Sequence, residues 1–263
     1  SYQVSLTTAN CGGSTTLSRT LEVLPPLIPP IEEFVVPSAV HTRGENETLW
    51  KTDLRIFNPC ASPILVDMRY LPEATNNNGS FLLGVEFTLA PNGTRLYNDV
   101  VEAIPGVVGD DNKGSLRISF DAPESCLPMI MSRTYNDTPS GTFGQSVPAV
   151  PVLPAQGDQM FLTGLAHNLY YRTNLGFANF TEEDVTLQVQ LLDERGDAIG
   201  DPVFPTVPAL STRQVLRVAE RANIFTDVNA FSARVETGGA AVAGYASVVD
   251  NITGDPVYFS PTA

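Results

Sequence analysis

The chain has few basic residues, only two lysines and no long apolar run. Of its 263 residues 15 are Lys or Arg and 29 are Asp or Glu, so the formal net charge is −14. Nucleic acids and anionic membranes are bound by clustered basic side chains, and a membrane-spanning helix needs about 20 consecutive apolar residues. We therefore expect no nucleic-acid partner and no membrane insertion.

Histidine and cysteine are also scarce, at two and three residues. The sequence has no Gly-x-Ser-x-Gly, His-Glu-x-x-His or Cys-x-x-Cys motif, which are spacings typical of hydrolase, zinc and redox sites. No alternation of strands and helices indicates a nucleotide-binding sheet. We therefore expect neither an enzyme nor a cofactor or metal.

What the chain does contain is an internal duplication. Residues 50–54 (WKTDL), followed by an apolar stretch to Asn58, recur as residues 171–175 (YRTNL), followed by a stretch to Asn179. A duplicated unit of this size is a duplicated domain rather than a short solenoid repeat. Residues kept in both copies are then most simply explained by the fold. Further matching segments are 39–41 with 165–167, 90–95 with 208–213, and 137–141 with 250–254.

Short segments in which apolar and polar residues alternate predict β-strands. Residues 64–70 (ILVDMRY) and 129–135 (MIMSRTY) are examples, and their spacing is typical of a β-sandwich. One short helix per repeat is predicted over residues 100–104, capped by Asp99, and over residues 217–223. The predicted fold is all-β, with two tandem Ig-like antiparallel β-sandwich domains preceded by a β-hairpin and a Pro-rich linker.

The chain divides into five predicted parts. The first part contains a Gly-rich turn between two segments of alternating polar and apolar residues. The second part contains four prolines, which favour a stiff, extended linker. These parts are an N-terminal β-hairpin (1–24), a Pro-rich linker (25–33), β-sandwich repeat one (34–150), a second linker (151–158) and β-sandwich repeat two (159–263).

Residues 2–16 (YQVSLTTANCGGSTT) resemble the last two strands of a PKD-type Ig-like domain, which commonly ends in a Y-x-V-x-L-x-V-x-N strand, a Gly/Ser turn and a Thr-rich strand. The earlier strands of such a domain are absent. The two large units are similar to tandem β-sandwich repeats of secreted bacterial multidomain surface proteins, most recognisably at residues 50–54 and 133–145. This resemblance implies an extracellular location and an architectural or adhesive role.

Two of the cysteines occur in the first repeat only, so the shared fold does not require them. Cys60 follows the turn at residues 58–59, and Cys126 precedes the strand predicted from Met129. In a sandwich those loops can meet at the same end, so we predict a Cys60–Cys126 disulfide formed in an oxidising compartment. The alternative is that the cysteines are buried free thiols, and the redox state of Cys11 stays open.

Several polar residues have both a functional and a structural interpretation. His41 and His167 occupy matching positions, which favours a structural role over an active site. The acidic segments 110–112 and 193–197 are interpreted as solvated hairpin tips rather than calcium sites. Turn and strand-end hydrogen bonding is likewise favoured over a metal or acid–base role for the aligned pairs Asp53 with Asn174 and Asp137 with Asp250.

Glycan attachment and sugar binding are two further interpretations. Among six Asn-x-Ser/Thr sequences, Asn78 and Asn92 have the most loop-like contexts and are the candidate glycosylation sites. Trp50 with nearby tyrosines offers a sugar-binding platform. Because Trp50 aligns with Tyr171, we favour a core or sheet-face role for it.

The hairpin leads to the first functional hypothesis. A two-stranded hairpin is marginal alone, and its unpaired edges recruit further strands. We hypothesise a structural subunit of an extracellular bacterial filament or surface array, a homo-polymer assembled head-to-tail by β-strand addition. The alternative is a carbohydrate- or protein-binding adhesin module with a glycan or cell-surface ligand. The predicted assembly interface consists of Tyr2, Val4, Leu6, Leu17, Leu21 and Val23.

Overall fold

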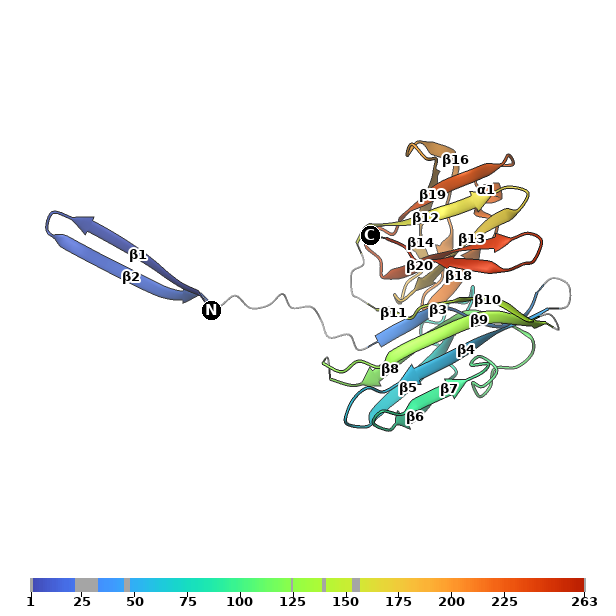
Figure 1. Cartoon of the computed structure of the whole chain (residues 1–263), viewed down its shortest axis with the longest axis horizontal. Helices are drawn as coiled ribbons and strands as arrows, with labels where there is room; N and C mark the ends of the chain where they lie inside the picture. Colours follow the sequence, from blue (N-terminus) through green and yellow to red (C-terminus); the bar gives the residue numbers. More distant parts are fainter. Residues whose placement is uncertain are drawn as a thin grey trace. The chain divides into compact units, whose positions relative to one another are not determined.

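The computed structural model describes residues 2–21, 33–44, 48–123, 125–138, 141–152 and 157–262. The chain divides into two compact units, Ser1–Pro30 and Ile31–Ala263, and their strands are labelled in Figure 1. Within the described residues, no helix has the length and apolar character needed to cross a membrane.

The first unit is a β-hairpin. Strands β1 (Tyr2–Asn10) and β2 (Gly13–Leu21) pair antiparallel from Tyr2↔Leu21 to Asn10↔Gly13. Hydroxyl pairs link the strands across one face, with 2.6 Å between the oxygens of Ser5 and Ser18. All described side chains of the hairpin are exposed, so this unit has no core among them.

The second unit begins with the first repeat, which is entirely antiparallel β-structure. Its strands pair in the order β10-β9-β4-β3-β8-β5-β6, with β7 beside β4 and β11 beside β3. They are β3 (Glu33–Arg43), β4 (Leu49–Phe57), β5 (Ile64–Pro72), β6 (Gly84–Leu89), β7 (Thr94–Tyr97), β8 (Asp111–Asp121), β9 (Met129–Thr138), β10 (Gly141–Ser146) and β11 (Val150–Pro151).

The second repeat contains two four-stranded sheets, ordered β12-β19-β15-β16 and β18-β13-β20-β21, and a small ribbon of β14 and β17. Its elements are β12 (Gln159–His167), β13 (Tyr171–Asn179), β14 (Val185–Thr186), β15 (Gln188–Leu192), β16 (Ala198–Val203), β17 (Thr206–Val207), β18 (Ser211–Val215), α1 (Val218–Arg221), β19 (Val228–Glu236), β20 (Val242–Asp250) and β21 (Pro256–Phe259).

The two repeats have the same strand order. The orders β3-β8-β5-β6 and β7-β4-β9-β10 in the first repeat correspond to β12-β19-β15-β16 and β18-β13-β20-β21 in the second. Equivalent positions also keep equivalent partners. Arg95 pairs with Ile56, and Arg213 pairs with Phe177, which agrees with the aligned sequence segments. The duplication seen in the sequence is therefore also a duplication of topology.

A threonine at matching positions in the two repeats links corresponding pairs of strands, β3 with β4 and β12 with β13. The Val40 amide donates to Thr52 Oγ1 at 2.9 Å, and the Ala166 amide donates to Thr173 Oγ1 at 3.2 Å. Both threonines are buried. These shared residues thus have a structural role, as the duplication argument predicts.

Each repeat buries its own apolar core. Strand alternation directs every second side chain of a strand inward, and the two clusters share none of their fully buried members. The largest such side chains are Leu54, Ile56, Ile64, Met68, Ile104, Leu116 and Ile118 in the first repeat, and Leu162, Leu165, Leu175 and Phe177 in the second.

Two local predictions need correction. The helix predicted over residues 100–104 is a hydrogen-bonded turn, although the Asp99 side chain does accept the Glu102 amide at 3.3 Å. The helix predicted over residues 217–223 is shorter, because α1 covers only Val218–Arg221. Such short segments lack enough consecutive backbone hydrogen bonds to sustain a longer helix.

Candidate ligand-binding cleft

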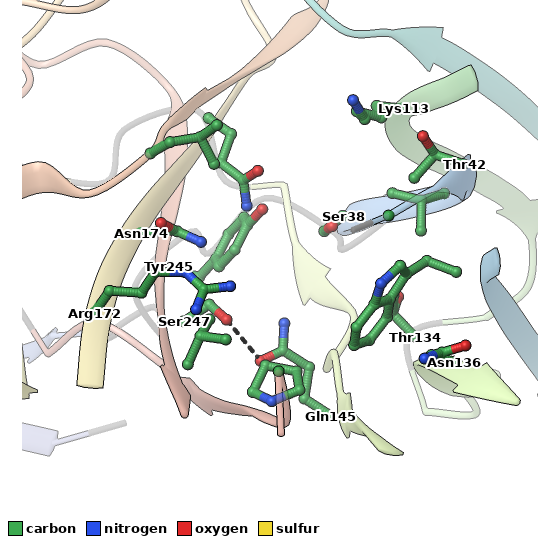
Figure 2. A pocket seen from close by; sticks show the side chains of 18 of the residues that line it. Ser38, Thr42, Lys113, Thr134, Asn136, Gln145, Arg172, Asn174, Tyr245 and Ser247 are labelled. Carbon is green, nitrogen blue, oxygen red and sulfur yellow. Dashed lines mark hydrogen bonds between the residues drawn. The ribbon is translucent and has the colours of Figure 1, made fainter. Parts of the chain in front are cut away.

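A cleft of about 600 Å³ lies between the two repeats. Residues of β3, β4, β8, β9 and β10 line it from the first repeat, and residues of β13, β18, β20 and β21 line it from the second. In Figure 2, Arg172 and Asn174 of the second repeat face Thr42 and Thr134 of the first across an open space. The volume falls within the range of roughly 300–1,000 Å³ that is usual for small-molecule sites.

Hydrogen bonds join the two walls at one end of the cleft. Glu73, just after β5, forms a parallel bridge with Thr212 of β18. Glu73 Oε1 also accepts the Gln214 amide at 2.9 Å. The buried Asn77 side chain donates from Nδ2 to the Leu210 carbonyl at 2.8 Å. The repeats are therefore connected by direct backbone and side-chain contacts as well as by the chain between them.

Two further contacts join the walls through β10. The Ser247 hydroxyl donates to Gln145 Oε1 at 3.1 Å, as the dashed line in Figure 2 marks. The Gly144 amide donates to Asp255 Oδ1 at 2.9 Å. Both repeats therefore contribute to the bonds that hold the cleft walls together.

The cleft presents amide and hydroxyl groups to its interior. Asn136 is only 6% exposed, and its Oδ1 has no hydrogen-bond partner among the described residues. A buried polar atom without a partner costs about 1–3 kcal/mol. Asn174, across the cleft, accepts the Arg217 amide on Oδ1 at 2.9 Å. Asn136 thus brings to the cleft wall a buried acceptor that no described residue satisfies.

Aromatic side chains form part of the walls. Tyr245 is 4% exposed and stacks on Tyr258 with ring centroids 5.4 Å apart. Burial raises the pKa of its phenol above the ordinary value, so the hydroxyl is a neutral hydrogen-bonding group. Trp50 is half-buried and also lines the cleft, whereas its aligned counterpart Tyr171 does not. The tryptophan is therefore a cleft residue as well as a sheet-face residue.

Charge in the cleft differs in sign from that of the whole chain. Among the described residues, Glu73 is the only acidic one that lines it, while the chain carries 29 acidic residues and 15 basic ones. The basic lining residues are Arg43, Lys113, Arg172, Arg213 and Arg217.

A second polar cluster surrounds His41, outside the cleft lining. His41 Nδ1 lies 2.7 Å from Asp99 Oδ2, and Nε2 lies 3.4 Å from Asp110 Oδ1. Burial works to lower the pKa of His41, but the hydrogen bond and charge of Asp99, the hydrogen bond of Asp110 and the charge of Glu102 together raise it above 6.5. One ligand atom each from His41, Asp99 and Glu102 would lie within 4.8 Å of one another. Both ring nitrogens already have protein partners, which supports the structural interpretation.

The matching histidine has different surroundings. His167 pairs with Val228 in the sheet, and its Nδ1 is buried with no hydrogen-bond partner among the described residues. The two histidines therefore share a position but not a hydrogen-bond network, and the structure brings no second His41-type cluster to the second repeat within the described ranges.

The predicted disulfide between Cys60 and Cys126 is confirmed. The two residues are bonded, with their Cα atoms 5.5 Å apart. Thr181 occupies the equivalent position in the second repeat, because its amide and that of Cys60 each donate at 2.9 Å to the preceding asparagine, Asn179 and Asn58. Cys11 is an exposed free cysteine in the hairpin turn.

The acidic segments are turns in which the carboxylates bond to backbone or basic groups. Asp193 Oδ1 accepts the amides of Arg195 and Asp197 at 2.8 and 2.9 Å. Asp250 Oδ1 accepts the amides of Thr253 at 2.8 Å and Ile252 at 2.7 Å, and these two bonds lower the pKa of Asp250. These positions act as turn and strand-end caps.

The hairpin residues of the predicted assembly interface are only partly described. Leu6 and Leu17 lie opposite each other in the register and are 66% and 63% exposed. The side chains of Tyr2, Val4 and Leu21, and the whole of Val23, lie outside the described residues.

Both candidate glycosylation sites are exposed. Asn92 lies in the turn between β6 and β7 at φ 55°. Asn78 donates from Nδ2 to the Glu182 carbonyl at 2.8 Å, so a glycan on that nitrogen would replace a contact between the repeats. Asn92 is the better candidate of the two.

The sequence interpretation missed the cleft as a site. Its polar residues are spread over eight strands and the adjoining turns, and no local motif connects them. The available signal was the scarcity of basic residues, five of which line one cavity. This clustering of basic residues can be seen only once the positions of the strands in the fold are known.

Comparison of the chain with protein-family models, with curated proteins and with solved structures gives no match. The resemblance to PKD-type and tandem surface-protein repeats therefore rests on the quoted residues alone.

Proposed function

We propose that the chain is a non-enzymatic, extracellular binding module of a secreted bacterial surface protein. In this proposal two tandem Ig-like β-sandwiches hold a carbohydrate in the cleft between them. The observation that carries the proposal is the cleft of about 600 Å³ with the unsatisfied, buried Oδ1 of Asn136 on its wall.

The chemistry of the lining favours a carbohydrate over an apolar ligand. Sugars offer many hydroxyl groups that donate and accept hydrogen bonds, and the cleft offers Asn136, Gln145, Asn174 and Ser247. The half-buried Trp50 adds an aromatic surface of the kind that packs against the C–H face of a sugar ring. Polar groups fix orientation in such sites, and aromatic surface supplies contact area.

Catalysis is less well supported by the same lining. Within the part of the chain that the structure describes, Glu73 supplies the only carboxylate of the lining, and its Oε1 already accepts the Gln214 amide. Glycoside hydrolysis usually requires a pair of carboxylates, and acyl transfer requires a nucleophile with an adjacent base. Neither set lines the cleft among the described residues.

An extracellular location is supported by the Cys60–Cys126 disulfide. Disulfides persist in oxidising compartments and are rare in the bacterial cytosol. The location can be tested by fractionating the native organism and detecting the protein with a specific antibody.

The binding proposal is tested by screening the protein on a glycan array and measuring the positive sugars by calorimetry. We expect Asn136→Ala to weaken binding about tenfold, as loss of a buried hydrogen bond does. Thr88→Ala, on an exposed position of β6 outside the cleft, is the matched control and should bind like the native protein. Binding to no sugar, or equal weakening by both variants, would contradict the proposal.

A second candidate function is the filament subunit, and the separate hairpin favours it. The hairpin is a compact unit by itself, and it exposes Leu6 and Leu17 together with two open strand edges. Unpaired edges are sites of strand addition. Negative-stain images of the native protein should show filaments, and removal of residues 1–24 should abolish them while both repeats stay folded. Filaments of the truncated protein would contradict this candidate.

A further inference from the structure

We propose that the ligand of the cleft is an anionic saccharide, whose acidic group is bound by Arg213 with support from Arg172 and Lys113. This inference rests on the proposed function and specifies its ligand class. It starts from the charge of the lining, where five of the described residues are basic and one is acidic.

The ion pairs around the cleft must be taken into account first. Arg43 pairs with Asp110 at 2.5 Å, Lys113 with Asp111 at 3.3 Å, and Arg217 with Glu220 at 3.1 Å. The three carboxylates do not line the cleft. All six side chains are at least 38% exposed, so solvent screens these pairs and each contributes little. A ligand anion can therefore compete with them.

Arg213 differs from these three residues. It is exposed on β18, lines the cleft, and forms no ion pair within the described part of the chain. Arg95, at the same register in the first repeat, instead has its guanidinium 5.4 Å from the ring centroid of Phe87 and 5.3 Å from that of Tyr97. The duplicated position thus has a structural partner in one repeat and faces the cleft in the other.

Arg172 extends into the opening shown in Figure 2, beside Ser247 and opposite Thr134. Its Nη1 donates to Asn251 Oδ1 at 2.8 Å, which orients the guanidinium. A guanidinium has five donors in a planar fork that suits carboxylate and sulfate oxygens. Arg172 thus adds a further positive charge to the cleft lining.

The charge of the whole protein limits the size of the anion. At a net charge of −14 the outer surface repels a long polyanion. A short acidic oligosaccharide can enter a cleft of about 600 Å³, where its hydroxyls meet Asn136 and Gln145 while its acidic group meets the arginines. The geometry therefore points to a sugar with one or a few charges, carried by a carboxylate or a sulfate ester.

The test is a calorimetric titration with matched saccharides. The probes are short oligosaccharides of glucuronic, galacturonic and mannuronic acid, each beside its carboxyl-reduced form, together with sulfated galactose oligosaccharides and their desulfated forms. We expect at least one acidic probe to bind about tenfold more tightly than its neutral partner, as charge-assisted bonds do. This preference should fall as NaCl increases.

Three variants locate the effect. Arg213→Gln should remove the preference for the acidic probe, Arg213→Lys should restore part of it, and Arg195→Gln should leave it unchanged. Arg195 lies exposed at the β15–β16 tip outside the cleft, so it is the matched charge control. Thermal unfolding of each variant verifies that the fold is intact, and Lys113→Gln provides a second cleft variant in case Arg213→Gln is unstable.

Each outcome has a distinct meaning. Preference for an acidic probe that both cleft variants reduce would support the inference, and the preferred probe identifies the group as carboxylate or sulfate. Equal affinity for acidic and neutral forms would overturn the inference and leave the proposed carbohydrate function intact. Binding to none of the probes, neutral or acidic, would overturn both.

Discussion

At the residue scale, two buried asparagines show what the duplication preserves. Asn58 Nδ2 lies within 3.1 Å of the Ser62, Leu89 and Ala90 carbonyls. Asn179 Nδ2 contacts the corresponding carbonyls of Glu183, Val207 and Pro208 at 2.7 to 3.1 Å. Each amide therefore closes one loop onto the end of another strand. No other side chain of this size supplies both the donors and the acceptor at that point.

We expect Asn58→Ala to destabilise the protein by about 3 kcal/mol, because buried carbonyls lose their donors. Asn179→Ala should cost a similar amount, since its contacts are the same. Urea unfolding of the two variants and of the exposed control Thr88→Ala measures this. Losses below about 0.5 kcal/mol, the usual range for surface positions, would show that the amides are not structural.

His41 gives a prediction of pH dependence. Burial lowers the pKa of His41, but the carboxylates of Asp99, Asp110 and Glu102 outweigh burial and raise it, so the protonated form is favoured in the folded state. This contribution is fully present below the unfolded pKa of about 6.5 and is lost as pH rises through the folded pKa. Stability should therefore fall as pH increases above about 6.5. The pKa values of Asp99 and Asp110 are shifted from an ordinary value of 3.8, so their titration affects stability at a lower pH than that of His41.

The measurement is the free energy of unfolding between about pH 5.5 and 8.5, with the pKa of His41 followed by NMR. His41→Gln should remove most of the slope that the native protein shows in this range, whereas His167→Gln should retain it. A native protein whose stability is constant across the range would contradict the prediction.

At the element scale, the disulfide connects the loop after β4 to the loop before β9. These loops are 66 residues apart in the sequence. The two loops lie close together because β4 and β9 are paired antiparallel, in a register that runs from Trp50↔Asn136 to Phe57↔Met129. The second repeat has the same strand pairing with no cysteine at the position of Cys60. The disulfide therefore stabilises a fold that does not depend on it.

Replacement of Cys60 and Cys126 together by serine should reduce the free energy of unfolding by about 4 kcal/mol on the chain-entropy model for a loop of this length. Strand content should be unchanged by circular dichroism, because the second repeat forms the same sheets without the bond. Cys11→Ser, at the exposed free cysteine, is the control and should change nothing. A double variant as stable as the native chain would rule out this contribution.

At the scale of the whole molecule, the contacts between repeats predict cooperative unfolding. The turn at residues 72–78 bonds to β18, and β10 bonds to Ser247 and Asp255. Residues 31–263 accordingly form one compact unit. Calorimetry of this unit should show one transition, because each repeat loses these bonds when the other unfolds.

Asn77→Ala removes the buried donor to the Leu210 carbonyl and should separate the transition into two, while Asn92→Ala on the outer turn should not. Two transitions in the native protein would show instead that the repeats are energetically independent.

The sequence alone determined the class of the fold and its internal symmetry. Strand alternation with period two and turn residues are local properties, so an all-β chain and a repeated strand order could be predicted. The Cys60–Cys126 disulfide could also be predicted, because both cysteines lie in turns at the ends of predicted strands. The helices at residues 100–104 and 217–223 were less predictable, since a cap such as Asp99 starts a turn and a helix equally well.

The cleft was decided only by the tertiary structure. Asn136, Arg172 and Arg213 come from three strands, and each has an unremarkable local sequence. They face one cavity because the turn at residues 72–78 pairs with β18, which brings the edges of the two repeats together. Such long-range pairing depends on the fit of two surfaces rather than on the period of either strand. The sequence therefore defined the two sandwich-like halves, whereas the site between them required their packing.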